Sequence, residues 1–349
     1  MASISGGKVT RALLAGLVLA LAACKGEPVT VKISGETMGT TYHVTAIDQD
    51  GRMTAGLVQK AVDAALADVN GKMSNWDPNS EISKFNARAE TSPAEISGEL
   101  AHVMRAANEI HLQSEGLFDV TLGPLIELWG FGARTPDSPV PSDEAIAAAL
   151  EATGQARLIT LASSKGTMAK ARPDTSIYLA AIAKGYGVDR VAGALQELRL
   201  EDYMVEIGGD LVTAGLNPMG QKWRIGIERP EPGSQALEQV IGLSGLGMAT
   251  SGDYRNYFEQ DGVRYSHIID GTTGRPITHN TASVTVLAEN AMLADGWATA
   301  LLALGQERGM EISERLGLAV LFITRDSTSG DAAFTSTPNA HFRALQASQ

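Results

Sequence analysis

The stretch from Tyr265 to Thr299 places three different local patterns in direct succession. It begins with a polar, glycine-rich segment, YSHIIDGTTGRPIT, continues with a β-like run, SVTVLA from Ser283, and ends with a helical run, ADGWATALLALG from Ala294. Closely spaced Gly, Asp, Thr and Pro predict a tight loop, whereas the apolar spacing of the last run predicts one buried helical face.

Asp295 and Thr299 lie four residues apart on the predicted helix, so their oxygens project from the same side. A carboxylate and a hydroxyl one turn apart suit a hard cation such as Mg²⁺, which prefers oxygen ligands. His267 lies in the preceding loop, at the end of a strand-like segment. A histidine beside an oxygen-ligand helix indicates metal-assisted phosphoryl chemistry.

A purely structural interpretation of the same residues stands beside this one. Asp295 serves as a helix N-cap in that interpretation, and Thr299 is an ordinary helical residue. His267 is then a structural histidine with satisfied hydrogen bonds.

The N-terminus has the pattern of a secretion signal. Lys8 and Arg11 precede a short apolar run, Ala12 to Ala23, which ends at Cys24, the only cysteine in the chain. This pattern is typical of a bacterial lipoprotein, so we expect a signal peptide over residues 1–23, lipidation of Cys24 and a soluble body over 24–349. A buried core cysteine and an uncleaved membrane anchor are the alternatives, but the apolar run is shorter than a membrane span needs.

Composition and missing motifs exclude several classes of function. The net charge is -12, and an acidic chain without a basic stripe argues against a nucleic-acid partner. The sequence lacks G-x-G-x-x-G, Walker A, H-E-x-x-H and G-x-S-x-G motifs. The usual dinucleotide, nucleotide, zinc and serine-hydrolase interpretations therefore have no motif support.

The order of predicted elements indicates one large α+β body in which mixed sheets are backed by helices. Helices are expected over 55–73, 97–114, 142–151 and 181–198, with a strand over 176–179 among others. Small and polar residues dominate from Ser327 onward, which predicts a loosely held tail. The sequence shows neither a clean domain linker nor an internal repeat.

Eight sequence blocks, in order, resemble the ApbE family of flavin transferases, which move FMN from FAD onto a protein. They are TMGT from Thr37, MSNWDPNSEISKFN from Met73, GLFDVTLGPLIELWGFG from Gly116, IAKGYGVD from Ile182, GGD from Gly208, ATSGDYRNYF from Ala249, SHIIDGTTGRPI from Ser266 and ADGWATALLALG from Ala294. They cover nearly the whole chain after the signal. The resemblance implies a T-fold-like architecture and a single catalytic body.

The resemblance also assigns roles to individual residues. Its implied FAD site is formed by Met38, Trp76, Leu117, Phe118 and Asp119, where aromatic and sulfur groups would contact the flavin and adenine rings. Core packing is the alternative for Phe118 and Met38.

The remaining implied roles concern the phosphates and the metal. Lys184 would meet a phosphate or the adenine moiety, or else be a solvated cation. Asp295, Thr299 and the backbone carbonyl of Ala181 match the family's Mg²⁺ ligands. His267 matches the histidine usually considered catalytic, and it also borders the FAD site.

Tyr178 departs from the family pattern. The segment before IAKGY usually carries an Asp where this chain has Tyr178, in SIYLAAIAKGY. Loss of a carboxylate that could bond ribose or adenine predicts that Tyr178→Asp would tighten FAD binding. Asp270 also differs, because the motif more often has Pro there, but Asp suits a turn equally well.

The family's acceptors are Thr or Ser side chains of partner proteins. These are typically subunits of sodium-pumping NADH:quinone reductase or of related electron-transport complexes. We therefore expect an enzyme that is lipid-anchored on the periplasmic side of the bacterial inner membrane, with the outer membrane left open. Two alternatives use the same residues: an FAD pyrophosphatase that yields FMN and AMP, and a non-catalytic FAD-binding lipoprotein.

Overall fold

The computed structural model describes residues 27–131, 139–231, 233, 236–326 and 334–347. The predicted signal peptide and Cys24 lie outside these ranges. Within them, no helix combines the length and the apolar content that crossing a bilayer requires.

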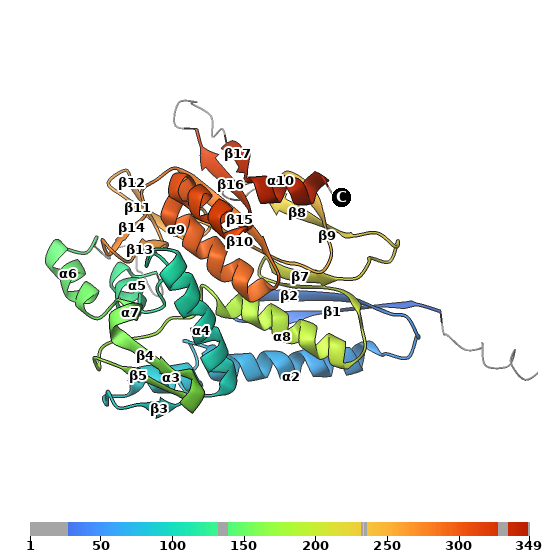
Figure 1. Cartoon of the computed structure of the whole chain (residues 1–349), viewed down its shortest axis with the longest axis horizontal. Helices are drawn as coiled ribbons and strands as arrows, with labels where there is room; N and C mark the ends of the chain where they lie inside the picture. The colour runs from blue at the N-terminus through green and yellow to red at the C-terminus, as the bar shows by residue number, and fades with distance from the viewer. Residues whose placement is uncertain (1–26, 132–138, 232, 234–235, 327–333, 348–349) are drawn as a thin grey trace, which may run out of the picture.

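A large antiparallel sheet runs through the molecule (Figure 1). Its strands, in spatial order, are β1 (Val29–Thr37), β2 (Thr40–Asp48), β6 (Asp202–Ile207), β7 (Asp210–Ala214), β10 (Gly247–Gly252), β15 (Thr281–Ala288), β16 (Ala319–Arg325) and β17 (Phe334–Pro338). Each of these neighbouring pairs is antiparallel. The expected α+β class is confirmed.

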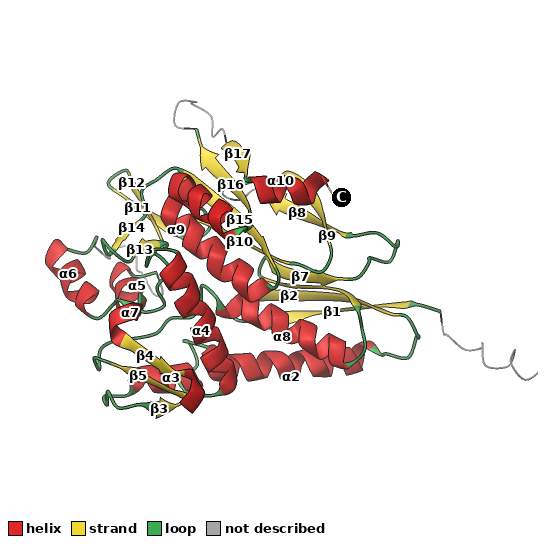
Figure 2. Ribbon diagram, in the orientation of Figure 1, coloured by secondary structure: helices red, strands yellow, loops and turns green. Residues whose placement is uncertain are grey.

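Long helices cover one face of this sheet, as Figure 2 shows. Those in contact with its strands are α2 (Ala55–Met73), α8 (Ala183–Glu197) and α9 (Ala291–Leu316), and α4 (Gly98–Gln113) packs against α2 and α9. The other face of the central strands packs against a hairpin, β8 (Trp223–Glu228) with β9 (Leu237–Leu243), and against α10 (Ala340–Ala347). Apolar cores on both faces hold the central strands rigidly.

Short elements surround one end of the sheet and carry the loops singled out above. They are α3 (Glu81–Ala87), β3 (Ala94–Glu95), α5 (Gly123–Trp129), α6 (Asp143–Glu151), α7 (Gln155–Leu158), β4 (Ile159–Ala162), β5 (Thr167–Lys170), β11 (Tyr257–Gln260), β12 (Val263–Ser266), β13 (Ile269–Asp270) and β14 (Arg275–Pro276).

Local capping explains why several helices begin where the sequence predicts. Side chains of Thr54, Ser97 and Ser142 each accept a hydrogen bond from a backbone N–H in the first turn of α2, α4 and α6. Such a bond satisfies one of the four N–H groups that a helix N-terminus leaves free. The predicted starts of these three helices are confirmed.

The predicted strand over 176–179 is wrong. This segment joins no sheet, and side chains bond its backbone groups instead: Asn86 accepts from the Ile177 N–H, and Asn75 accepts from the Leu179 N–H. Helix α8 follows at Ala183, two residues later than predicted.

The prediction of a loosely held tail is wrong for residues 334–347. β17 adds an outer strand to the main sheet, and Phe342 of α10 is completely buried. Asn339 fixes the turn between them, since its side chain accepts from the Val320 and Phe342 N–H groups and donates to the Leu318 carbonyl. Burial of Phe342 and the hydrogen bonds of Asn339 therefore hold this segment in place despite its polar composition.

Candidate active site

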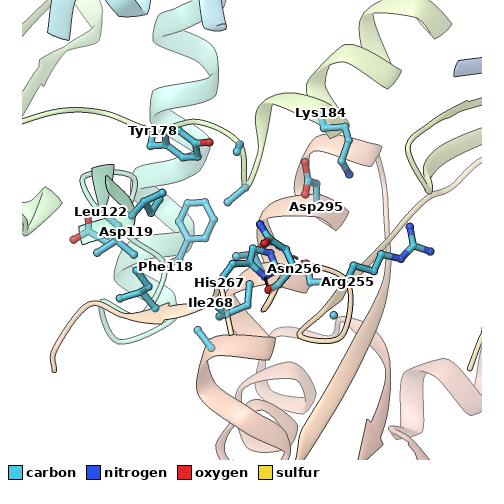
Figure 3. Close-up of a pocket in the computed structure, with 18 of the residues that line it drawn as sticks. Phe118, Asp119, Leu122, Tyr178, Lys184, Arg255, Asn256, His267, Ile268 and Asp295 are labelled. Atoms are coloured by element: carbon cyan, nitrogen blue, oxygen red, sulfur yellow. Dashed lines mark hydrogen bonds between the residues drawn. The ribbon is translucent and has the colours of Figure 1, made fainter. Parts of the chain in front are cut away.

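A pocket of about 300 Å³ opens where the predicted histidine loop meets the N-terminal part of α9. Figure 3 shows Tyr178, Leu122 and Phe118 on one side of it and Lys184 and Asp295 on the other. The walls come from six parts of the chain: the segment leading into α5, the turn before α8, the β6–β7 turn, the end of β10 with the following loop, the segment from His267 to Ile269, and α9.

Most residues that the sequence suggested for a site line this pocket. They are Leu117, Phe118, Asp119, Tyr178, Ala181, Lys184, His267, Asp295 and Thr299. The fold thus gathers the predicted metal ligands, the histidine and part of the predicted FAD site around one cavity.

Trp76 and Met38 do not line it. Trp76, 71% exposed, borders a second pocket of about 590 Å³, which shares Tyr178 and Ile126 with the first. The rings of Trp76 and Tyr178 meet edge to face, with centroids 6.4 Å apart. Met38 occupies the β1–β2 turn and packs against the main core, beside Gly187 of α8.

Asp295 is not the N-cap of its helix. Asn290 caps α9 by accepting from the Leu293 N–H, and Asp295 lies in the second turn, 4% exposed. Its Oδ2 accepts a hydrogen bond of 2.9 Å from the Gly185 N–H at the start of α8. The structural alternative for Asp295 is therefore wrong in its stated form.

The hydrogen bond from the Gly185 N–H to Asp295 also affects the backbone carbonyl of Ala181. In an unbroken helix the Gly185 N–H would bond the carbonyl four residues earlier, which belongs to Ala181. Because it bonds Asp295 instead, the Ala181 carbonyl lacks its helical partner at the edge of the pocket. Thr299, one turn after Asp295, shares a hydrogen bond of 3.1 Å with Ser251.

Asp210 of the GGD block, for which the sequence indicated no role, reaches the site through the pocket residue Lys184. It is 2% exposed, and its carboxylate forms an ion pair with Lys184. Burial raises the pKa of both Asp210 and Asp295, and the Lys184 ammonium opposes that change in each. Two buried carboxyl groups thus share one ammonium, which favours a further cation here.

The donor set around Asp295 fits a hard cation. Among the residues that the structure describes, no three His, Cys, Asp or Glu side chains cluster as metal ligands. Any cation would therefore rely on one carboxylate, the Thr299 hydroxyl and the Ala181 carbonyl. Oxygen donors of these three kinds are typical of Mg²⁺ sites that leave positions for water and phosphate.

His267 has a defined tautomer. Its Nδ1 lies 3.0 Å from the backbone carbonyl of Asn256. A carbonyl can only accept, so Nδ1 carries the proton and Nε2 keeps its lone pair. Burial lowers the pKa of His267 below its usual value, although the Asn256 carbonyl and Asp253 act in the opposite direction. The imidazole at the pocket is therefore a neutral base at pH 7.

Comparison with known proteins points to one family. A sequence model described as the ApbE family matches residues 38–322. A protein of Haemophilus influenzae named FAD:protein FMN transferase is 43% identical over 335 residues, covering 94% of this chain and 95% of its own length. A Vibrio cholerae protein of the same name is 45% identical over 312 residues, covering 89% of this chain and 92% of its own.

Solved structures agree with these matches. The flavin transferase ApbE from Vibrio cholerae superposes with a TM-score of 0.83 at 42% identity, covering 91% of this chain and 99% of the other. The Thermotoga maritima apbe protein gives a TM-score of 0.79 at 28% identity. The expected ApbE-like fold is confirmed.

Proposed function

This chain belongs to the ApbE family, and from that membership we propose that it transfers FMN from FAD to a hydroxyl of an acceptor protein. The observation that carries the proposal is the pocket itself. It joins a neutral histidine, a carboxylate and hydroxyl one helical turn apart, and a lysine beside an aromatic wall. Relatives of nearly the same length bear the name FAD:protein FMN transferase.

The two adjoining pockets suit an elongated dinucleotide. The first pocket is lined by Lys184, His267 and Asp295, and the second is bordered by Trp76. Tyr178 and Ile126 line both pockets. Aromatic faces stack well on flavin and adenine rings. FAD lying across both pockets would bring its pyrophosphate near Lys184 and Asp295 and leave a ring against Trp76.

His267 acts as general base in this proposal. The acceptor's Thr or Ser hydroxyl forms a bond to the FMN phosphorus, and the bond between that phosphorus and the AMP oxygen breaks. The hydroxyl proton passes to Nε2 of His267, which the Nδ1 bond to Asn256 leaves free. FMN becomes esterified to the acceptor, and AMP leaves.

Asp295, Thr299 and the Ala181 carbonyl would hold Mg²⁺. When bound there, Mg²⁺ would neutralise charge on the pyrophosphate and its leaving group. Lys184 keeps its charge because Asp210 and Asp295 lie beside it and raise its pKa against the effect of burial. Catalysis then rests mostly on positioning and charge stabilisation, as in other phosphoryl transfers.

Acceptor and location follow from the family resemblance. We propose subunits of sodium-pumping NADH:quinone reductase or related electron-transport complexes as acceptors. Lipidation of Cys24 would tether the enzyme to the periplasmic side of the inner membrane, near such subunits. Trypsin-accessible, membrane-associated protein in spheroplasts, released into the soluble fraction by Cys24→Ser, would support this location.

The activity is tested by incubating the purified chain with FAD, Mg²⁺ and a flavin-acceptor domain, with EDTA in a parallel reaction. AMP release and a fluorescent acceptor band that both need Mg²⁺ support the transferase. AMP without any fluorescent band, over several acceptor domains, would favour the pyrophosphatase. Bound FAD without AMP would favour the binding lipoprotein.

The metal site is tested separately by Mn²⁺ titration followed by electron paramagnetic resonance. Asp295→Asn and Thr299→Ala should each weaken Mn²⁺ binding at least about tenfold, since each removes one of three protein ligands. Thr250→Ser, which keeps the hydroxyl that pairs with Thr285 on the neighbouring strand, serves as the control and should bind as the parent does.

A further inference from the structure

The segment from Thr175 to Leu179 belongs to no sheet and contributes to a wall of the site. Its residue Tyr178, labelled in Figure 3, borders both pockets, and Ala181 of the first pocket follows three residues later. Backbone hydrogen bonds reach its two ends, where the Thr175 N–H donates to the Arg172 carbonyl and the Leu179 carbonyl accepts from the N–H groups of Ile182 and Ala183. In its middle the Tyr178 N–H donates to the Val120 carbonyl at 2.7 Å. Both backbone groups of Ile177 bond side chains instead.

Asn75 and Asn86 support the segment, because both side chains form hydrogen bonds with the backbone of Ile177. Asn86 accepts from the Ile177 N–H at 2.8 Å and donates to the Ile177 carbonyl at 2.8 Å. Asn75 donates to the same carbonyl at 2.7 Å and accepts from the Leu179 N–H at 3.1 Å. Each amide uses both its donor and its acceptor, as a neighbouring strand would.

Lys170 anchors the beginning of the segment. Its side chain is 2% exposed, and the ammonium donates to the carbonyls of Asn86, Pro173 and Thr175 at 2.6, 2.8 and 3.2 Å. All three of its N–H donors are thereby used. The Lys170 ammonium joins the backbone of Asn86 directly to the start of the wall.

We infer that Asn75 and Asn86 are positioning residues, which hold Tyr178 and the Ala181 carbonyl at the pocket through Ile177 and Leu179. Asn75 and Asn86 lie near the two ends of the block MSNWDPNSEISKFN, and both form hydrogen bonds with Ile177. The block is therefore as long as it must be to contain both amides. The inference rests on the proposed function only for the FAD affinity and the kinetic measurements described below, and not for hydrogen exchange.

The amide is the chemical feature that matters. Asn86→Ala removes both hydrogen bonds, whereas Asn86→Asp keeps the acceptor for the Ile177 N–H but sets a carboxylate against the Ile177 carbonyl. Leaving buried backbone groups without partners is costly, so the segment should leave its place more often. Both substitutions should therefore destabilise the segment from Thr175 to Leu179 more than the rest of the fold.

The test is hydrogen exchange by mass spectrometry on the full chain, combined with FAD affinity in the absence of acceptor. For Asn75→Ala and Asn86→Ala we expect exchange over residues 175–181 to rise about tenfold or more. We expect exchange in α2 and in the second half of α8 to stay as in the parent. The dissociation constant of FAD should rise about tenfold, with KM affected more than kcat.

Asn79→Ala is the matched control. Asn79 lies in the same loop and is exposed, and it bonds Asp77 through its backbone N–H. This variant should match the parent in exchange and in FAD affinity. A double variant at Asn75 and Asn86 should cost less than the two single variants added together, because both donate to one carbonyl.

Native exchange over 175–181 in both single variants would overturn the inference. So would an equal rise in every helix, which would indicate global destabilisation. Hydrogen exchange and the dissociation constant of FAD need neither an acceptor protein nor turnover, and only the comparison of KM with kcat requires them. Failure of the transferase proposal, seen as absent FMN transfer by the parent, is therefore distinguishable from failure of this inference.

Discussion

Asp189 and Asp295 each cap the helix that carries the other. Asp189 of α8 accepts hydrogen bonds of 2.9 Å from the N–H groups of both Ala291 and Met292, in the first turn of α9. Asp295 of α9 accepts from the Gly185 N–H, in the first turn of α8. The two N-termini are thus tied together reciprocally, and this fixes Asp295 and Thr299 relative to the turn that contains Ala181.

Gly185 permits this close approach of the two helices. A Cβ at Gly185 would collide with the Ala291 carbonyl and with Asp295. Gly185→Ala should therefore lower the free energy of unfolding by about 3 kcal/mol or yield no folded protein, because backbone atoms cannot yield as a side-chain tip can. Gly193→Ala, on the same helix with open space at its Cβ, should be neutral or stabilise by up to about 1 kcal/mol. Urea unfolding of the pair measures this, and equal stabilities would contradict it.

Asp189 should make stability depend on pH. Burial raises the pKa of Asp189 to about 6, although the two N–H donors act against it. Between about pH 4 and pH 6 the folded chain keeps a proton that the unfolded chain releases, so stability falls as pH rises and then levels off. The fall attributable to Asp189 is at most roughly 3 kcal/mol.

Asp189→Asn isolates this effect, because an amide does not titrate. The difference in free energy of unfolding, parent minus variant, should decline from pH 4 to pH 6 in urea titrations. A difference that stays constant or increases over that range would disprove the assignment.

His267→Gln should reduce FMN transfer about 10² to 10⁴-fold, the usual contribution of a general base. FAD affinity should change only severalfold, because the proposed role of the imidazole is to accept the proton of the acceptor's hydroxyl. Since burial lowers the pKa of His267, the acid limb of kcat/KM in the parent should fall below pH 6.5. An acid limb at or above pH 6.5, or one that persists in the variant, would count against His267 as the base.

Tyr178→Asp should tighten FAD binding. The ring borders both pockets, so its removal should widen the space open to FAD, and a carboxylate would restore the acceptor that the family pattern carries there. Tyr178→Phe keeps the ring and removes only the hydroxyl, so it should bind FAD as the parent does. Flavin fluorescence titration compares the three proteins, and equal or weaker affinity in the Asp variant would refute the prediction.

The sequence predicted some of the site residues and missed others. It reveals interactions between residues near each other in the chain, but not those between distant segments. Asp295 and Thr299 could be paired from sequence because helical periodicity places residues four apart on one side. Asp210 could not be assigned, since it reaches Lys184 only through the strand order of the sheet. The family resemblance grouped Met38 with Trp76, but it could not show that a turn packs Met38 against the core, away from the pocket.

The sequence by itself determined the local features of this protein: the α+β class, the long helices, and the starts of three of them, which the structure shows to be capped by Thr54, Ser97 and Ser142. Each depends on hydrogen bonds or side-chain periods that span a few residues. Tertiary structure alone decided that Ile177 is held by Asn86 and Asn75, 91 and 102 positions earlier in the chain. It also decided that two helix N-termini cap each other. Such contacts form only when the sheet and its helices pack, because packing brings together residues that no local pattern relates.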